Sequence, residues 1–208
     1  MFRSPRDDAR RAFFEAKAWQ WETNCDGQQY QQLQEGLRRW KVRPGEVVLD
    51  LGCGTGVLAR LLAAAVGNEG RVVAVDYALP MLWRGRREAT GILWVGARAQ
   101  ALPLPPSSVD RAILLAVWPH LRQKSRVLRE LVRVLKPNGW LHLWHLASRR
   151  QVNRVHRQAG KPIALDQLEP ASQLASRLQA HGFSVVEVEE GQSYRISAVK
   201  EGDGGRHG

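Results

Sequence analysis

From Glu46 onward, short apolar runs alternate with stretches whose apolar residues recur every three or four positions. Runs rich in β-branched residues and bounded by glycines are typical of buried parallel strands, whereas the longer spacing predicts amphipathic helices. The predicted strands are 46–51, 71–76, 91–96, 108–117 and 140–146, and the predicted helices between them are 57–67, 78–89 and 120–135. Such alternation favours an α/β domain with a parallel sheet and right-handed crossovers.

The two ends of the chain depart from this alternation. After a predicted helix at 167–181, two strand-like segments at 183–190 and 192–200 are separated only by about Gly191, which favours an antiparallel hairpin at the sheet edge. The first forty residues are helical in pattern and rich in Gln, Trp and Arg. At 208 residues the chain fits one core. We therefore expect a helical cover at 1–41, one domain at 42–200 and a flexible tail at 201–208.

Composition narrows the class of protein. With 44% hydrophobic and 25% charged residues, the chain is predicted to be globular. It contains no apolar run of the roughly 20 residues needed to cross a bilayer, and its start lacks the apolar centre of a secretory signal. Two cysteines, Cys25 and Cys53, are too few for a disulfide framework or a zinc cluster, so the expected location is the reducing cytoplasm.

The formal charge of +11 is concentrated in one region. Between Arg122 and Lys161 there are eleven lysines and arginines but a single acid, Glu130. Such a region can face an anionic substrate, a nucleic acid or a membrane surface. A solvated helix face would give the same composition, so the charge alone leaves these alternatives open.

The glycine-rich segment VVLDLGCGTG, at 47–56, is the most informative stretch. It predicts a strand that turns tightly into a helix, with glycines that let the backbone approach a ligand. Asp76 ends the next predicted strand, where a carboxylate can accept hydrogen bonds from ribose hydroxyls. The dinucleotide pattern GxGxxG is replaced here by GxGxG, with Asp50 two positions before Gly52. An acid suits a cofactor that carries a cationic amino acid better than it suits a pyrophosphate. A glycine turn without a ligand is the alternative.

Four segments together resemble the class I S-adenosylmethionine-dependent methyltransferases. They are DLGCGTG at 50–56, VVAVD at 72–76, SVDRAILLAVWPHL at 108–121 and ELVRVLKPNGWL at 130–141. The resemblance covers 42–200 and is strongest to the small ubiquinone/menaquinone-biosynthesis-like "methyltransferase domain" type. It implies a Rossmann-like, doubly wound sheet of seven strands in the order 3-2-1-4-5-7-6, with strand 7 antiparallel. It also implies S-adenosyl-L-methionine as cofactor and S-adenosyl-L-homocysteine as product.

The resemblance assigns roles around the glycine loop. Asp50, Gly52 and Gly54 would line the methionine part of the cofactor, Asp76 would hold its ribose, and Tyr77 would flank its adenine. The full predicted cofactor-binding set is Asp50, Gly52, Cys53, Gly54, Thr55, Gly56, Asp76, Tyr77, Met81, Arg98, Ala99 and Leu115. One position departs from the family. Many relatives carry an acid that contacts the adenine amino group, but the aligned residue here is Arg98, which donates and cannot accept.

Methyl transfer from a sulfonium mainly requires that the acceptor atom be aligned with the methyl group and shielded from water. A base is needed only when the acceptor must lose a proton. Acceptor contacts are expected from loops after the fourth and fifth strands, because ligands bind beyond the carboxyl ends of parallel strands. The segment RRAFFEAKAWQWE, at 10–22, resembles the opening helix of several small relatives, which folds over the pocket. Phe14 and Trp19 are therefore predicted to contact the acceptor, unless they anchor this helix to the core.

The segment LHLWHLASRRQVNRVH, at 141–156, contains three histidines. His142 and His145 would point to opposite faces of a strand and cannot share a metal ion, so no metal is expected. In the helix that follows, Arg149, Asn153 and His156 share one face by spacing. The pattern HxxSRxxVNxxHxxxGxP…D is similar to a segment of some small methyltransferases. A surface helix with incidental polar spacing is the alternative.

The resulting hypothesis is a methyltransferase that acts directly on a small polar or anionic molecule. Its predicted catalytic residues are His145, His156 and His120, and its predicted substrate-binding residues are Arg149, Asn153, Trp19 and Phe14. Methylation of RNA, DNA or protein through the basic 122–161 region is a weaker alternative. The chain has AVWP where base-amino methyltransferases carry (N/D/S)PP(Y/F), and neither cysteine follows a proline. A non-catalytic cofactor-binding regulator is the second alternative.

Overall fold

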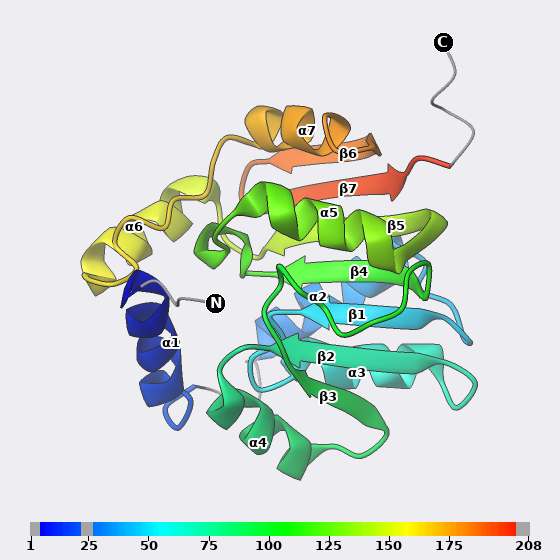
Figure 1. Ribbon diagram of the computed structural model, residues 1–208, viewed down its shortest axis with the longest axis horizontal. Helices are drawn as coiled ribbons and strands as arrows, with labels where there is room; N and C mark the ends of the chain where they lie inside the picture. Colours follow the sequence, from blue (N-terminus) through cyan, green and yellow to red (C-terminus); the bar gives the residue numbers. More distant parts are fainter. Residues whose placement is uncertain (1–4, 22–26, 203–208) are drawn as a thin grey trace.

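A seven-stranded sheet with helices on both faces organises the chain (Figure 1). The computed structural model describes residues 5–21 and 27–202, and for residues 5–8 only the backbone. The strands are β1 (Val47–Leu51), β2 (Arg71–Asp76), β3 (Ile92–Gly96), β4 (Val109–Leu115), β5 (Leu135–His145), β6 (Phe183–Glu190) and β7 (Tyr194–Lys200). Their order in the sheet is β3-β2-β1-β4-β5-β7-β6, and β7 is antiparallel to both neighbours. The predicted order and the predicted antiparallel seventh strand are confirmed.

The helices surround the sheet, and several of them cover its two faces through separate apolar layers. They are α1 (Pro5–Lys17), α2 (Gly27–Arg39), α3 (Val57–Val66), α4 (Leu79–Glu88), α5 (Lys124–Val134), α6 (Arg149–Ala159) and α7 (Ala171–Gln179), with a short 3-10 turn, η1 (Trp118–His120). Leu128 of α5 and Leu174 of α7 are fully buried in one layer, and Leu33 of α2 and Leu62 of α3 are buried in the other. This double cover explains why the central strands β1 and β2 are buried along almost their whole length.

Helix α1 lies across the edge of the sheet at which the parallel strands end, beside α6 (Figure 1). Ala18, just after α1, is fully buried against Ala78 and Met81, which begin the α4 region. The Arg84 guanidinium of α4 donates hydrogen bonds to the backbone oxygens of Ala18 and Trp21. The segment 10–21 therefore roofs the carboxyl end of the sheet, where ligands of such folds bind.

The segment KPNG, at 136–139, was expected to separate a helix from a strand, but the structure places it inside β5. Val109 pairs with Leu135 and Arg111 pairs with Trp140, so the intervening residues bulge out of the ladder. The bulge contains Asn138 in a left-handed conformation (φ 62°), and the Lys136 ammonium lies 2.6 Å from an Asp110 carboxylate oxygen. The turn residues thus extend the strand through a β-bulge instead of ending it.

His142 is the centre of a buried polar network on the α2 face of the sheet. Its Nε2 lies 2.7 Å from Nη1 of Arg111, and its Nδ1 lies 2.9 Å from the Ser197 hydroxyl. Because arginine can only donate, Nε2 accepts and the ring is neutral. The imidazole stacks on Trp40, with ring centroids 4.2 Å apart. His145, three residues later, contacts Tyr194 and lies near α6, so the predicted opposite orientation of the two histidines is confirmed.

A prediction for stability follows from His145. Burial, together with the nearby charges of His120 and His156, lowers the pKa of His145 to about 3, compared with about 6.5 in an unfolded chain. The unfolded chain therefore binds more protons between these pH values, and the free energy of unfolding falls as the pH drops below about 6.5. This residue alone contributes up to ~1.4 kcal/mol per pH unit in that window.

The variant His145→Gln removes this contribution, so its stability should depend less steeply on pH than that of the natural chain. Urea unfolding at several pH values between 7 and 4 measures the two slopes. The matched control is His181→Gln, because His181 is only half-buried and bonds the backbone oxygen of Arg177 at the end of α7. Equal slopes for the natural chain and His145→Gln would contradict the prediction.

Candidate active site

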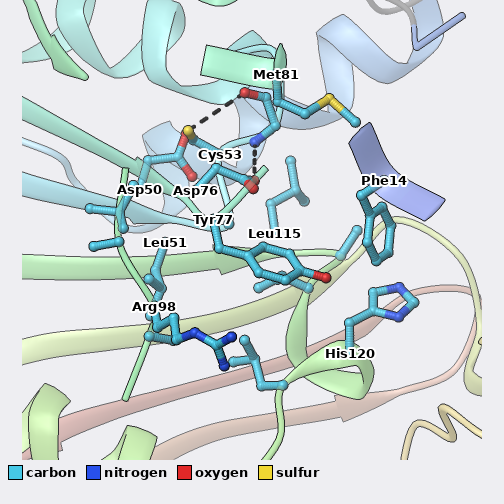
Figure 2. A pocket seen from close by; sticks show the side chains of 18 of the residues that line it. Phe14, Asp50, Leu51, Cys53, Asp76, Tyr77, Met81, Arg98, Leu115 and His120 are labelled. Carbon is cyan, nitrogen blue, oxygen red and sulfur yellow. Dashed lines mark hydrogen bonds between the residues drawn. The ribbon is translucent and has the colours of Figure 1, made fainter. Parts of the chain in front are cut away.

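A cavity of about 240 Å³ lies between the carboxyl ends of β1, β2 and β4 and the roof formed by α1 (Figure 2). Residues from the glycine loop and the end of β2 form one side, and Leu115, Val117 and His120, which follow β4, form the opposite side. Phe14 and Trp21 line it from the roof segment. The cavity therefore lies where the right-handed crossovers on the two faces of the sheet diverge, as is usual for ligand sites in this fold class.

The glycine loop meets the cavity through backbone rather than side chains. Gly52 has a φ of +79°, and a Cβ atom at this position would collide with the Val117 side chain. Gly54 has a φ of +54° and, apart from the Trp21 ring nitrogen at 4.0 Å, open space where a Cβ would be. The amides of Gly52 and Cys53 both donate to the backbone oxygen of Val75, at 2.7 and 3.0 Å. Glycine is thus required at 52 by crowding, whereas Gly54 leaves room for a ligand.

Asp76 ties this loop to the end of β2. One carboxylate oxygen accepts from the Gly54 amide at 2.9 Å, as drawn in Figure 2, and the other accepts from the Ala78 amide at 2.9 Å. Burial raises the pKa of Asp76, and the hydrogen bonds from backbone amides partly offset this rise. Each carboxylate oxygen has a second lone pair, so Asp76 can hold the loop and still accept hydrogen bonds from a ligand's hydroxyls.

Asp50 is the least satisfied acid of the cavity. It lies at the carboxyl end of β1, is only 1% exposed, and its Oδ2 has no hydrogen-bond partner among the described residues. Burial and, secondarily, the charge of Asp76 raise its pKa to about 7. A buried carboxylate without a partner is costly, and a cationic ligand group beside Asp50 would remove that cost. This acceptor therefore fits the ammonium of a methionine moiety, as the resemblance implied.

The structure brings together nearly the whole predicted cofactor set. Eleven of its twelve residues line the cavity, including Tyr77, Met81, Arg98, Ala99 and Leu115. The exception is Gly56, which does not line it. Gly56 begins α3 with a φ of +81°, and a Cβ there would collide with the Trp94 ring. Its role is therefore the close packing of α3 on the sheet rather than contact with a ligand.

The predicted acceptor residues divide into two groups. His120 and Phe14 line the cavity, with their ring centroids 5.0 Å apart in an edge-on arrangement (Figure 2). His145, His156, Arg149, Asn153 and Trp19 do not line it. The Trp19 side chain is 61% exposed and points to solvent, so it does not belong to the roof's inner surface.

The polar face of α6 is engaged by protein rather than by the cavity. Asn153 accepts from the Leu168 amide at 2.7 Å and donates to the Leu168 oxygen at 3.0 Å. Nδ1 of His156 bonds the backbone oxygen of Asp166, and Arg149 pairs with Glu190. The predicted common face exists, since Asn153 and His156 are buried, but it holds the 160–170 loop instead of a substrate.

The two charged residues that support His120 were absent from the predicted set. Asp166 accepts a hydrogen bond from Nδ1 of His120 at 3.0 Å, and the Arg10 guanidinium makes a buried ion pair with the same carboxylate. Asp166 is the final D of the pattern HxxSRxxVNxxHxxxGxP…D, which begins at His145, and this pattern was the sequence signal for it. No local pattern links Arg10 to it, because the two are 156 positions apart.

Metal-binding groups and membrane-spanning helices were sought among the residues that the structure describes. Within residues 5–21 and 27–202, no group of three His, Cys, Asp or Glu side chains is arranged to hold a metal ion. None of the helices in those ranges is long and apolar enough to span a membrane.

Comparison with known proteins gives concordant matches. Residues 49–143 match the family model described as "Methyltransferase domain". The chain is 40% identical over 116 residues to the ubiquinone/menaquinone biosynthesis C-methyltransferase UbiE of Xanthomonas oryzae pv. oryzae, covering 49% of this chain and 46% of that protein. It is 33% identical over 169 residues to UbiE of Enterobacter sp., covering 76% and 59%. The chain therefore spans about half the length of the curated relatives it matches.

A solved structure supports the same fold. A SAM-dependent methyltransferase from Aquifex aeolicus superposes with a TM-score of 0.68 at 22% identity, covering 80% of this chain and 88% of that one. The strand order, the glycine loop between β1 and α3, the acid at the end of β2 and the family match agree with one another. The chain is therefore similar to S-adenosylmethionine-dependent methyltransferases in sequence over residues 49–143 and in the fold of the described residues.

Proposed function

We propose that the protein transfers a methyl group from S-adenosylmethionine to a small-molecule acceptor and releases S-adenosylhomocysteine. The observation that carries this proposal is Asp50, whose buried carboxylate oxygen has no described partner at the edge of the cavity. A cation is the ligand group that such an oxygen favours. S-adenosylmethionine supplies an ammonium for Asp50 and ribose hydroxyls for Asp76, whereas a nicotinamide dinucleotide would place a pyrophosphate against an acid.

The protein's contribution to the chemistry is binding, orientation and exclusion of water. Gly54 lets a ligand approach the backbone closely, and Tyr77, Met81 and Leu115 offer apolar surfaces to a planar ring. When bound, S-adenosylmethionine supplies an activated methyl group on a sulfonium, so alignment of the acceptor accounts for much of the required acceleration.

A small acceptor is favoured over a macromolecule by the roof. Phe14 and Trp21 line the cavity from the segment that covers it, so an extended nucleic-acid or protein chain would have to displace that segment. The names of the relatives, which refer to ubiquinone and menaquinone biosynthesis, support a small molecule as well. Apolar Phe14, Val117 and Leu121 near His120 favour an acceptor with an apolar body over the strongly polar one suggested by charge alone. We also propose a cytoplasmic location, on the sequence grounds given above.

The variant Asp76→Ala should weaken S-adenosylhomocysteine binding by about 1–3 kcal/mol, because a charged acceptor for ribose is lost. Isothermal titration calorimetry measures this change. The matched control is Asp110→Ala, because Asp110 also accepts from a backbone amide, that of Val47 at 2.8 Å, but at the opposite end of β1. Both variants should lower the melting temperature, and only Asp76→Ala should lower the affinity. Unchanged affinity in Asp76→Ala would argue against the proposed site.

Binding should also depend on the protonation of Asp50. Because its pKa lies at about 7, Asp50 is largely protonated at pH 6 and offers no charge to an ammonium group. The affinity of the natural chain for S-adenosylhomocysteine should therefore rise between pH 6 and pH 8, with release of a proton from Asp50.

The comparison uses Asp50→Asn, which keeps the size of the side chain and removes its titration. This variant should bind more weakly than the natural chain at pH 8 and should show a flatter pH dependence, since the ligand's own titration is common to both proteins. Calorimetry in two buffers of different ionisation enthalpy counts the protons released. Identical proton release by both proteins would exclude Asp50 as the responsible group.

A further inference from the structure

His120 has its two ring nitrogens in different surroundings. Its Nδ1 lies 3.0 Å from Oδ2 of Asp166, a side chain that is buried and does not line the cavity. A carboxylate only accepts hydrogen bonds, so Nδ1 carries the proton of this bond, and in the neutral ring Nε2 carries the lone pair. Because the ring itself lines the cavity, we infer that Nε2 is the nitrogen available to a ligand there.

Asp166 is fixed from several directions. The Arg10 guanidinium binds both of its oxygens, with Nε at 3.1 and 3.0 Å. Its backbone amide donates to the Ile163 oxygen at 2.8 Å, and its backbone oxygen is bonded by His156. Burial raises the pKa of Asp166, but the hydrogen bonds from His120 and Arg10 outweigh it and hold the pKa below its usual value. Asp166 is therefore a carboxylate at neutral pH, suited to orienting and stabilising a protonated imidazole.

The surroundings of His120 combine this polar support with an apolar approach. On the cavity side it meets the Phe14 ring, with Val117 and Leu121 close by along the lining. The charged and titratable groups near His120 are Asp166, Arg10, His156 and His145. The ring centroids of His120 and His156 are 4.7 Å apart. A hydrogen-bonded His–Asp pair at the wall of an apolar cavity is the arrangement that general-base catalysis uses.

We propose that His120 is the general base of the reaction, that Asp166 and Arg10 are its positioning residues, and that the acceptor is a small molecule with an apolar body and an ionisable hydroxyl group. This inference rests on the proposed methyl transfer. In the step, the O–H bond breaks and its proton moves to Nε2 of His120. The electron pair left behind, on the oxygen or on a carbon conjugated with it, forms the new bond to the methyl carbon. The carbon–sulfur bond breaks with its pair going to sulfur, which becomes the neutral thioether.

The imidazolium then returns its proton to water, and when carbon is the acceptor, that carbon loses its own proton to water as well. Arg10 comes from the roof segment, so the base is completed by the same helix that covers the cavity. If Arg10 and Asp166 only docked α1 onto the 160–170 loop, loss of His120 would slow methylation of all acceptors equally. If His120 is the base, its loss slows only acceptors that still carry their hydroxyl proton.

The experiment uses two probes of similar shape at pH 8: 4-methylphenol, which keeps its hydroxyl proton at this pH, and 4-nitrophenol, which is already largely ionised. S-adenosylhomocysteine formation is measured for the natural chain and for His120→Gln, and cofactor affinity is measured by calorimetry. We expect His120→Gln to lose roughly 10²–10⁴-fold of its rate with 4-methylphenol. Its rate with 4-nitrophenol and its cofactor affinity should stay within a few-fold of the natural values.

The variant Asp166→Asn should show the same selective loss to a smaller extent. Combined with His120→Gln it should cause little further loss, because both changes act on one unit. Arg10→Gln should behave like Asp166→Asn. His181→Gln, which changes a histidine at the end of α7, is the control and should leave both rates unchanged.

Equal losses with both phenols would make His120 a structural residue, and unchanged rates would exclude it from the reaction; either result overturns the inference. A natural chain that binds the cofactor but methylates neither phenol overturns the hydroxyl acceptor and leaves the proposed cofactor site standing. Failure of the natural chain to bind S-adenosylmethionine or S-adenosylhomocysteine is the separate result that would overturn the proposed function itself.

Discussion

The contact on which the site depends is the pair of hydrogen bonds from the Gly54 and Ala78 amides to the Asp76 carboxylate. One carboxylate thereby fixes two loops, the glycine turn after β1 and the turn from β2 into α4. On this side of the cavity, the loops are held by backbone hydrogen bonds and by the Asp76 carboxylate, and few other side chains contribute. Such a wall depends little on the identity of the surrounding side chains.

The opposite side of the cavity is built from long-range contacts. The buried face of α6 holds the loop that carries Asp166, and this loop in turn meets Arg10 of α1 and His120 after β4. The site is therefore built mainly from backbone on the β1–β2 side and from long-range side-chain contacts beneath the roof. Under the proposed function, the second side is the one that would meet the acceptor.

This division also explains what could be predicted. The strand positions, the terminal hairpin and the glycine-loop side of the cavity have local signals: apolar runs, a GxGxG turn and an acid at a fixed distance. The strand order was predicted from the family resemblance. The role of α6 could not be deduced in the same way. Helical spacing correctly placed Asn153 and His156 on one face, but spacing gives no information about which segment covers that face. KPNG was misjudged because proline and glycine signal a turn or a bulge equally well, and only pairing with β4 decides between them.

The position of Arg10 has a consequence for the timing of each reaction cycle. Arg10 is part of α1 and Asp166 is part of the 160–170 loop, so displacement of the roof from the sheet would separate the guanidinium from the carboxylate. If ligands exchanged by such a movement, the support of His120 would be complete only while the roof is in place.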